Sequence, residues 1–60
     1  MDTLTSSELI PGLFVVNQNK PEWGIGQIQS SIKNIVTVNF ENVGKKVINM
    51  NEVNLDIIKL

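Results

Sequence analysis

The heptapeptide NIVTVNF, residues 34–40, carries the clearest structural signal in this 60-residue chain. Val36, Val38 and Phe40 occupy alternate positions, and the two positions between them are polar. Because successive side chains of a β-strand point to opposite faces, this alternation is typical of a strand with one buried face. The sequence therefore predicts a strand here with these three side chains in the core and Ile35 as the exception to the pattern.

Four further segments have the length and composition of strands. They are residues 13–16, 23–30, 45–48 and 53–57, separated by stretches rich in Asn, Pro and Gly. Ile, Val and Thr supply 18 of the 60 residues, whereas Ala does not occur. β-Branched side chains favour strands and Ala is the strongest helix former, so the composition predicts an all-β protein.

Two glycines inside the second predicted strand indicate how the sheet bends. Gly24 and Gly26 flank Ile25, and glycine within a strand marks a bend, a bulge or the close approach of another group. We expect a positive φ or crowding at one of these two glycines, and Gly24 is the first candidate because it adjoins the preceding loop. Five short strands with such bends favour a closed or half-closed antiparallel barrel, because closure removes exposed strand edges.

The chain is too short for more than one domain. We expect an N-terminal tail over residues 1–9 and a single barrel domain over residues 10–60. The predicted core draws one or two inward-facing side chains from each strand. These are Val15, Ile28, Val36, Val38, Phe40, Val47 and Leu55.

The sequence has few residues suited to catalysis or to metal binding. His and Cys are absent, which removes the commonest general base, the commonest transition-metal ligand and every thiolate. Gly24-Ile25-Gly26 begins like a dinucleotide-binding fingerprint, but Gln29 stands where the third glycine belongs. We therefore expect no enzyme, no cofactor and no metal site.

The charge balance bears on the class of partner. The chain has five Lys, no Arg and six Asp or Glu residues, and its net charge is −1. Nucleic-acid-binding domains usually carry a basic surface that neutralises phosphates, so we expect weak or no nucleic-acid binding. The sequence has no apolar run long enough to span a membrane and no signal-peptide pattern, which predicts a cytoplasmic protein without a membrane segment.

The remaining class of function is the recognition of a partner by a few surface side chains, and four residues are candidates for the contact. Trp23 is the only Trp, and it is either a lid on one end of the barrel or a hot spot at an interface. Phe14 is either a core residue or a surface anchor, and residues 13–16 form the best candidate for an exposed edge strand. Lys45 and Lys46 are either a solvated strand end or a rim for an acidic partner.

The sequence resembles a family of small bacterial proteins known only as a domain of unknown function. The resemblance lies in PEWGIGQI (residues 21–28) and VTVNFENVGKKVI (residues 36–48), which follow the pattern P-x-W-G-x-G-x-V/I and then V-x-V-x-F-x-x-x-G-x-K. It covers residues 10–55, most of the chain.

The same W-G-x-G element, followed by an alternating strand that ends in Phe, also resembles the sequence of the Tudor-like tail of UvrD/PcrA-type repair helicases. The lead-in PGLFVV, residues 11–16, also looks like the P-G-x-x-V-V of the RNA-polymerase-binding module of CarD-type transcription regulators. Both modules are SH3-like or Tudor-like barrels that dock on RNA polymerase. The resemblance implies this fold, and it makes RNA polymerase the first partner to consider.

Together these observations predict a five-stranded SH3-like or Tudor-like barrel that acts as a non-catalytic protein-interaction module connected with transcription or repair. The predicted partner surface contains Phe14, Trp23, Lys45 and Lys46. Two alternatives stay open. One is a small barrel that binds nucleic acid, with the Trp23 ring as a stacking platform beside Lys33, Lys45 and Lys46. The other is a structural homodimer whose edge strands pair.

Overall fold

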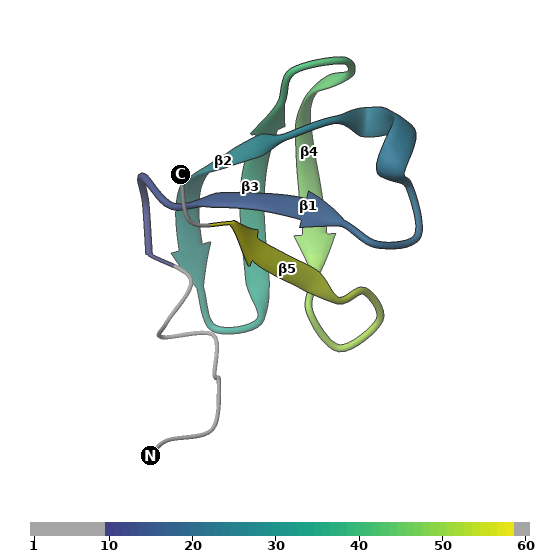
Figure 1. The fold of residues 1–60 in the computed structure, drawn as a ribbon. Helices are drawn as coiled ribbons and strands as arrows, with labels where there is room; N and C mark the ends of the chain where they lie inside the picture. The colour runs from purple at the N-terminus through teal and green to yellow at the C-terminus, as the bar shows by residue number, and fades with distance from the viewer. Residues whose placement is uncertain (1–9, 59–60) are drawn as a thin grey trace.

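A computed structural model describes residues 10–58, so the tail expected over residues 1–9 lies outside the described residues. The described chain forms five strands and one turn of 3₁₀ helix (Figure 1). In chain order these are β1 (Phe14–Asn17), η2 (Pro21–Trp23), β2 (Gly26–Ile32), β3 (Ile35–Phe40), β4 (Gly44–Asn49) and β5 (Leu55–Ile58). No helix among residues 10–58 is long and apolar enough to cross a membrane.

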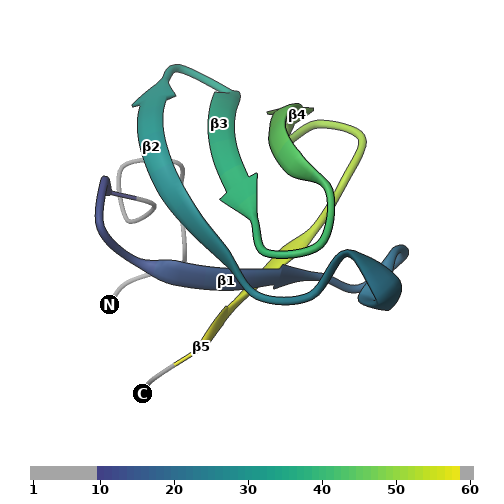
Figure 2. The same ribbon diagram turned by 90° about the horizontal axis from the view of Figure 1, so that it is seen from above.

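The five strands form one antiparallel sheet in the order β4-β3-β2-β1-β5. β2, β3 and β4 make a curved layer, and β1 and β5 cross it steeply to make a second layer (Figures 1 and 2). Within residues 10–58, β4 and β5 are the two edges and do not pair with each other, so the barrel is half-closed. The expected all-β, SH3-like fold class is confirmed.

The prediction that residues 13–16 form an exposed edge strand is wrong. β1 lies between two neighbours: Phe14 pairs with Gln27 of β2 on one side and with Ile58 of β5 on the other. The apolar sequence of this segment reflects its position between two strands, with Val15 facing the core.

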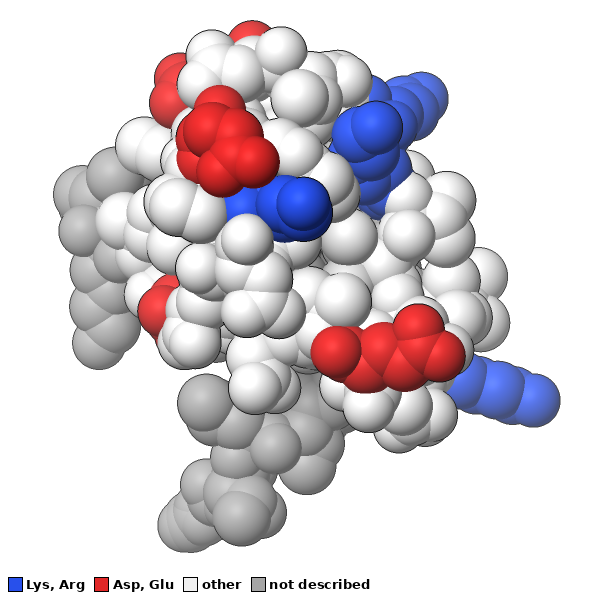
Figure 3. All heavy atoms as spheres, turned by 90° about the vertical axis from the view of Figure 1, so that its right-hand side faces the viewer, with Lys and Arg blue, Asp and Glu red and all other residues white. Residues whose placement is uncertain are grey.

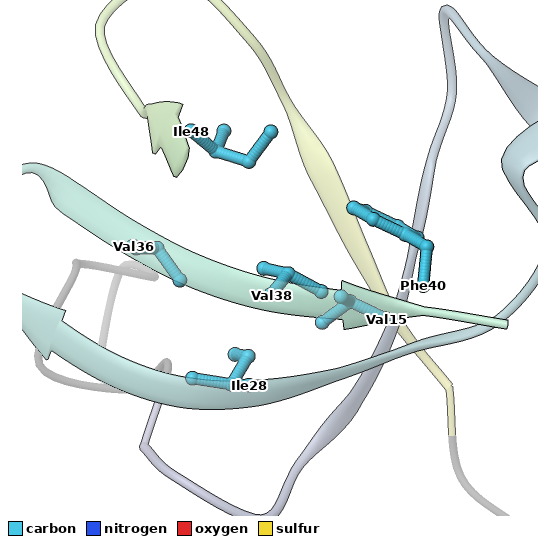
Figure 4. Close-up of a cluster of buried hydrophobic side chains, with 6 residues drawn as sticks. All are labelled: Val15, Ile28, Val36, Val38, Phe40 and Ile48. Carbon is cyan, nitrogen blue, oxygen red and sulfur yellow. The ribbon is translucent and has the colours of Figure 1, made fainter. Parts of the chain in front are cut away.

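The core lies between the two layers, and its side chains point toward one another from four strands (Figure 4). It consists of Val15, Ile28, Val36, Val38, Phe40 and Ile48. Val47 was predicted in this core and is instead 70% exposed. Both Val47 and Ile48 are β-branched, and only the pairing of Ile48 with buried Val36 decides which of them faces inward. Leu55 is half-buried and packs against the core.

The connection before β2 also differs from the prediction, because Trp23 ends η2 and does not belong to the strand. Pro21 starts the helical turn, where its fixed φ fits and its missing N–H costs nothing. The N–H of Gly24 donates to the carbonyl of Pro21 at 3.1 Å and closes the turn.

The C-terminal end of β2 extends to Ile32, two residues beyond the predicted end of the strand. The turn to β3 is therefore the dipeptide Lys33-Asn34, with Lys33 at a φ of 55°.

The expectation for the two glycines is confirmed, and each has its own reason. Gly24 has a φ of 81°, a conformation that residues with a side chain rarely adopt. Gly26 pairs with Phe40, and a Cβ on Gly26 would lie only 2.7 Å from the Cδ1 atom of that ring. The absence of a side chain on Gly26 therefore lets Phe40 pack directly against the β2 backbone.

Candidate interaction surface

The four residues predicted for the partner surface do not form one patch. Lys45 pairs with Asn39 across the β3–β4 ladder, and Lys46 pairs with Val38. Side chains of paired residues share a face of the sheet and adjacent residues alternate. Lys46 therefore lies on the core side with Val38, whereas Lys45 lies on the outer side with Asn39.

Trp23 and Lys46 meet at one end of the core. The Trp23 ring packs edge-on against Phe40, with 5.2 Å between ring centroids and an interplanar angle of 62°. Lys46 Nζ lies 5.4 Å from the centroid of the Trp23 ring, within the range of a cation–π contact. We call Trp23, Phe40 and Lys46 the Trp23 cluster. Its Trp and Lys are half-buried, so Trp23 covers the core and still presents part of its surface.

The turn after β3 holds Trp23 in this position. The side-chain amide of Asn42 donates to the Glu22 carbonyl at 2.9 Å, and the backbone N–H of Asn42 donates to the Trp23 carbonyl at 3.1 Å. One residue earlier, Glu41 accepts a hydrogen bond from the Ile25 N–H at its Oε2 atom, at 2.9 Å. The turn after β3 thus fastens the segment that carries Trp23.

Phe14 and Lys45 lie on the other face, in a row that crosses the whole sheet. Each member pairs with the next on the adjacent strand, in the order Ile58, Phe14, Gln27, Asn39 and Lys45. We call this set the outer row. Phe14 is half-buried and Gln27, Asn39 and Lys45 are exposed. Adjacent strands are about 4.8 Å apart, so Phe14 and Lys45 are separated by roughly 14 Å.

An open depression of about 340 Å³ lies over the middle of the outer row. It is lined by Phe14, Ile25, Gly26, Gln27, Asn39 and Glu41. Sequence reasoning identified only Phe14 as a surface candidate here. The polar residues that alternate with buried ones in β2 and β3 could have indicated this surface. Gln27 and Asn39 share a face of the sheet because they pair with each other.

Charges of both signs are interspersed on this small surface. Residues 10–58 contain four Lys and four Asp or Glu residues. Figure 3 shows acidic and basic side chains side by side on the face that it views, without a continuous basic surface there. The described residues contain no group of three or more acidic side chains that could hold a metal ion.

Comparison with known proteins identifies one family. A family model described as "Protein of unknown function (DUF3553)" matches residues 9–58, which is most of the chain. No curated protein and no solved structure matches the chain. The matched span begins just before β1 and ends with β5, so it coincides with the half-closed barrel.

Proposed function

The chain belongs to the DUF3553 family of unknown function, and we propose that it is a small non-catalytic protein-interaction module that docks on RNA polymerase or on a transcription or repair complex. The observation that carries this proposal is the partial exposure of two aromatic rings on a small sheet. Phe14 and Trp23 are both half-buried. Such rings bury much apolar area at low entropic cost when a partner covers them.

The absence of His and Cys from the sequence supports a role in binding over one in catalysis. A module of this size recruits a partner through a few anchor side chains, and each of its two aromatic rings has a lysine on the same face of the sheet. Lysines at the rim of an interface guide the approach of an acidic partner surface and discriminate against basic ones.

The choice of RNA polymerase is supported by the likeness of this chain to the Tudor-like helicase tails and CarD-type modules, which dock on that enzyme. The shared W-G-x-G element has a physical role in this chain. Gly24 turns the backbone after η2, and Gly26 lets Phe40 approach, so that Trp23 lies over the Phe40 ring. The element therefore places an aromatic side chain at one end of the barrel.

The experiment is a binding titration of the whole chain against purified core RNA polymerase, by fluorescence anisotropy of a dye at the N-terminus. We expect binding at micromolar concentrations that weakens in Phe14→Ser, Lys45→Glu or Lys46→Glu. Testing the lysines one at a time separates the two faces, since only Lys46 accompanies Trp23. Lys33→Glu is the matched control, because Lys33 lies in the β2–β3 turn, away from both faces' candidate residues.

Each variant is first checked for a folded circular dichroism spectrum. Absence of binding by the parent chain at tens of micromolar would discard RNA polymerase as the partner. Binding that survives in every folded variant would leave polymerase as partner and place the contact elsewhere. A parallel titration with single-stranded DNA at two salt concentrations tests the nucleic-acid alternative, which requires affinity that falls steeply with salt.

A further inference from the structure

The depression over the outer row has a defined chemical lining. Two neighbouring cross-strand rows frame it: Phe14, Gln27 and Asn39 in one, and Ile25 and Glu41 in the other. The backbone N–H of Glu41 donates to the Ile25 carbonyl at 2.9 Å, which aligns the second row with the sheet. Each of the two rows therefore contributes one apolar side chain, Phe14 or Ile25, beside amide or carboxylate groups.

The polar groups in this lining are one carboxylate and two side-chain amides, whose oxygens accept hydrogen bonds. Among the described residues that line the depression, Glu41 is the only charged one, and its Oε2 atom accepts a hydrogen bond from the Ile25 N–H at 2.9 Å. The Gln27 amide nitrogen donates to the Gly12 carbonyl at 3.4 Å, which leaves its amide oxygen for another donor. Asn39 presents a second exposed amide beside it. A ligand that matches this lining carries positive charge and several donors.

We infer that the depression binds an arginine side chain of a protein partner; this inference rests on the proposed interaction function and names the chemistry recognised at one part of that surface. A guanidinium is planar, weakly hydrated and has five N–H donors, so it can stack on the Phe14 ring while it donates to Glu41 and to amide oxygens. Its aliphatic stem fits against Ile25. An anionic ligand does not match, because the Glu41 carboxylate lines the site.

Lys45 adds a positive charge next to the depression. It pairs with Asn39 and so lies beyond the amide end of the depression, about one strand spacing away. An acidic residue next to the arginine in the partner would meet this ammonium group. The surface therefore suits a partner segment that carries an arginine and a carboxylate close together.

The direct test uses small probes and ¹⁵N NMR spectra of the whole chain. N-acetyl-arginine amide should shift the side-chain amide signals of Gln27 and Asn39 and the backbone signals of Ile25 and Glu41. We expect saturation with a Kd of about 1–10 mM, as suits a single exposed side chain. N-acetyl-citrulline amide is the control probe, because it has nearly the same shape without the charge, and it should bind about two- to fivefold more weakly.

Variants of the chain provide the second arm. Glu41→Gln should weaken arginine binding about fivefold, because the charge is lost while an amide oxygen still accepts from the Ile25 N–H. Glu52→Gln, in the exposed turn between β4 and β5, should leave the affinity unchanged. Lys45→Gln should strengthen binding of the arginine probe by about twofold, because it removes a nearby like charge.

Equal binding of arginine and citrulline, shifts confined to other residues, or an unchanged affinity in Glu41→Gln would each overturn the inference. Equal affinity for N-acetyl-lysine amide would overturn the assignment to a guanidinium. The outcome is independent of the polymerase titration. Arginine binding without polymerase binding would discard the proposed partner alone, and polymerase binding without arginine binding would discard this inference alone.

Discussion

The Trp23 cluster and the outer row lie on opposite faces of the same sheet and are built in different ways. In the Trp23 cluster the side chains contact one another: Trp23 packs on Phe40, and Lys46 lies over the Trp23 ring. In the outer row, by contrast, strand register alone places the neighbours, and three of its five members are exposed. A change in the first region therefore alters stability and surface together, whereas a change in the second alters mainly the surface.

The largest expected difference between the two regions is in the response of their Phe residues to truncation. Phe40→Ala should lower the free energy of unfolding by about 3–5 kcal/mol, because it removes a ring that is 1% exposed and leaves a cavity under Trp23. Phe14→Ala removes a half-buried ring and should cost about 1–2 kcal/mol. Urea denaturation followed by circular dichroism measures both.

For a domain of this size the first of these losses can approach the total stability. If Phe40→Ala is unfolded in buffer, Phe40→Leu keeps most of the volume and should still be destabilised more than Phe14→Leu. Equal losses for the two positions would contradict the division into a packed cluster and an exposed row.

A more moderate effect is expected where Gly26 allows the close approach of Phe40. Gly26→Ala should cost about 1–3 kcal/mol, because its Cβ would overlap the side chains of Val38 and Phe40. Val38→Ala alone should cost about 1–3 kcal/mol through the cavity it leaves. The double variant tests the origin of the first cost.

If crowding against Val38 contributes, Gly26→Ala should be less destabilising when Val38 is already Ala, since one of the two side chains that the added methyl group overlaps is then shortened. Strict additivity of the two changes would show that the cost of Gly26→Ala comes from the Phe40 ring or from the backbone and not from crowding against Val38. Thermal unfolding of the four proteins, parent included, measures the coupling.

The smallest expected difference is between the two adjacent lysines. Lys46→Met should cost about 0.5–1 kcal/mol, because it removes the cation from the Trp23 ring. Lys45→Met, on the exposed outer face, should stay within about 0.5 kcal/mol of the parent. Trp23 is the only Trp, so its fluorescence reports on the cluster directly.

Its emission spectrum should change in Lys46→Met and remain as in the parent for Lys45→Met. Identical spectra for all three proteins would mean that the ammonium group does not occupy the ring face in solution. A change in Lys45→Met alone would contradict the assignment of the two lysines to opposite faces.

Much of the fold was predictable because it depends on local patterns. The alternation in residues 34–40 correctly identified β3 and its three buried side chains. The two glycines were correctly assigned to strained or crowded positions, since a glycine in a strand needs a structural reason. The error at Val47 came from a strand with two adjacent apolar residues, where alternation does not indicate the inward side.

The residues of the candidate site were harder to predict. Residues adjacent in the sequence can lie on opposite faces of the sheet, and residues far apart in the sequence can line one depression. Lys45 and Lys46 are adjacent in sequence but lie on opposite faces, as the pleat requires. Gln27, Asn39 and Glu41 come from different strands and turns, and no local pattern indicates that they line one depression with Phe14. Their convergence depends on the register of β1, β2 and β3.

The strand content, the all-β class and the need for glycine at positions 24 and 26 could be predicted from the sequence, because these features follow from propensities and periods within a few residues. The identity of the two edge strands, the burial of Ile48 in place of Val47 and the side chains that share a face became known only from the folded chain. These features depend on pairing between distant strands, and a shift of one residue in that pairing would exchange the two faces of a strand.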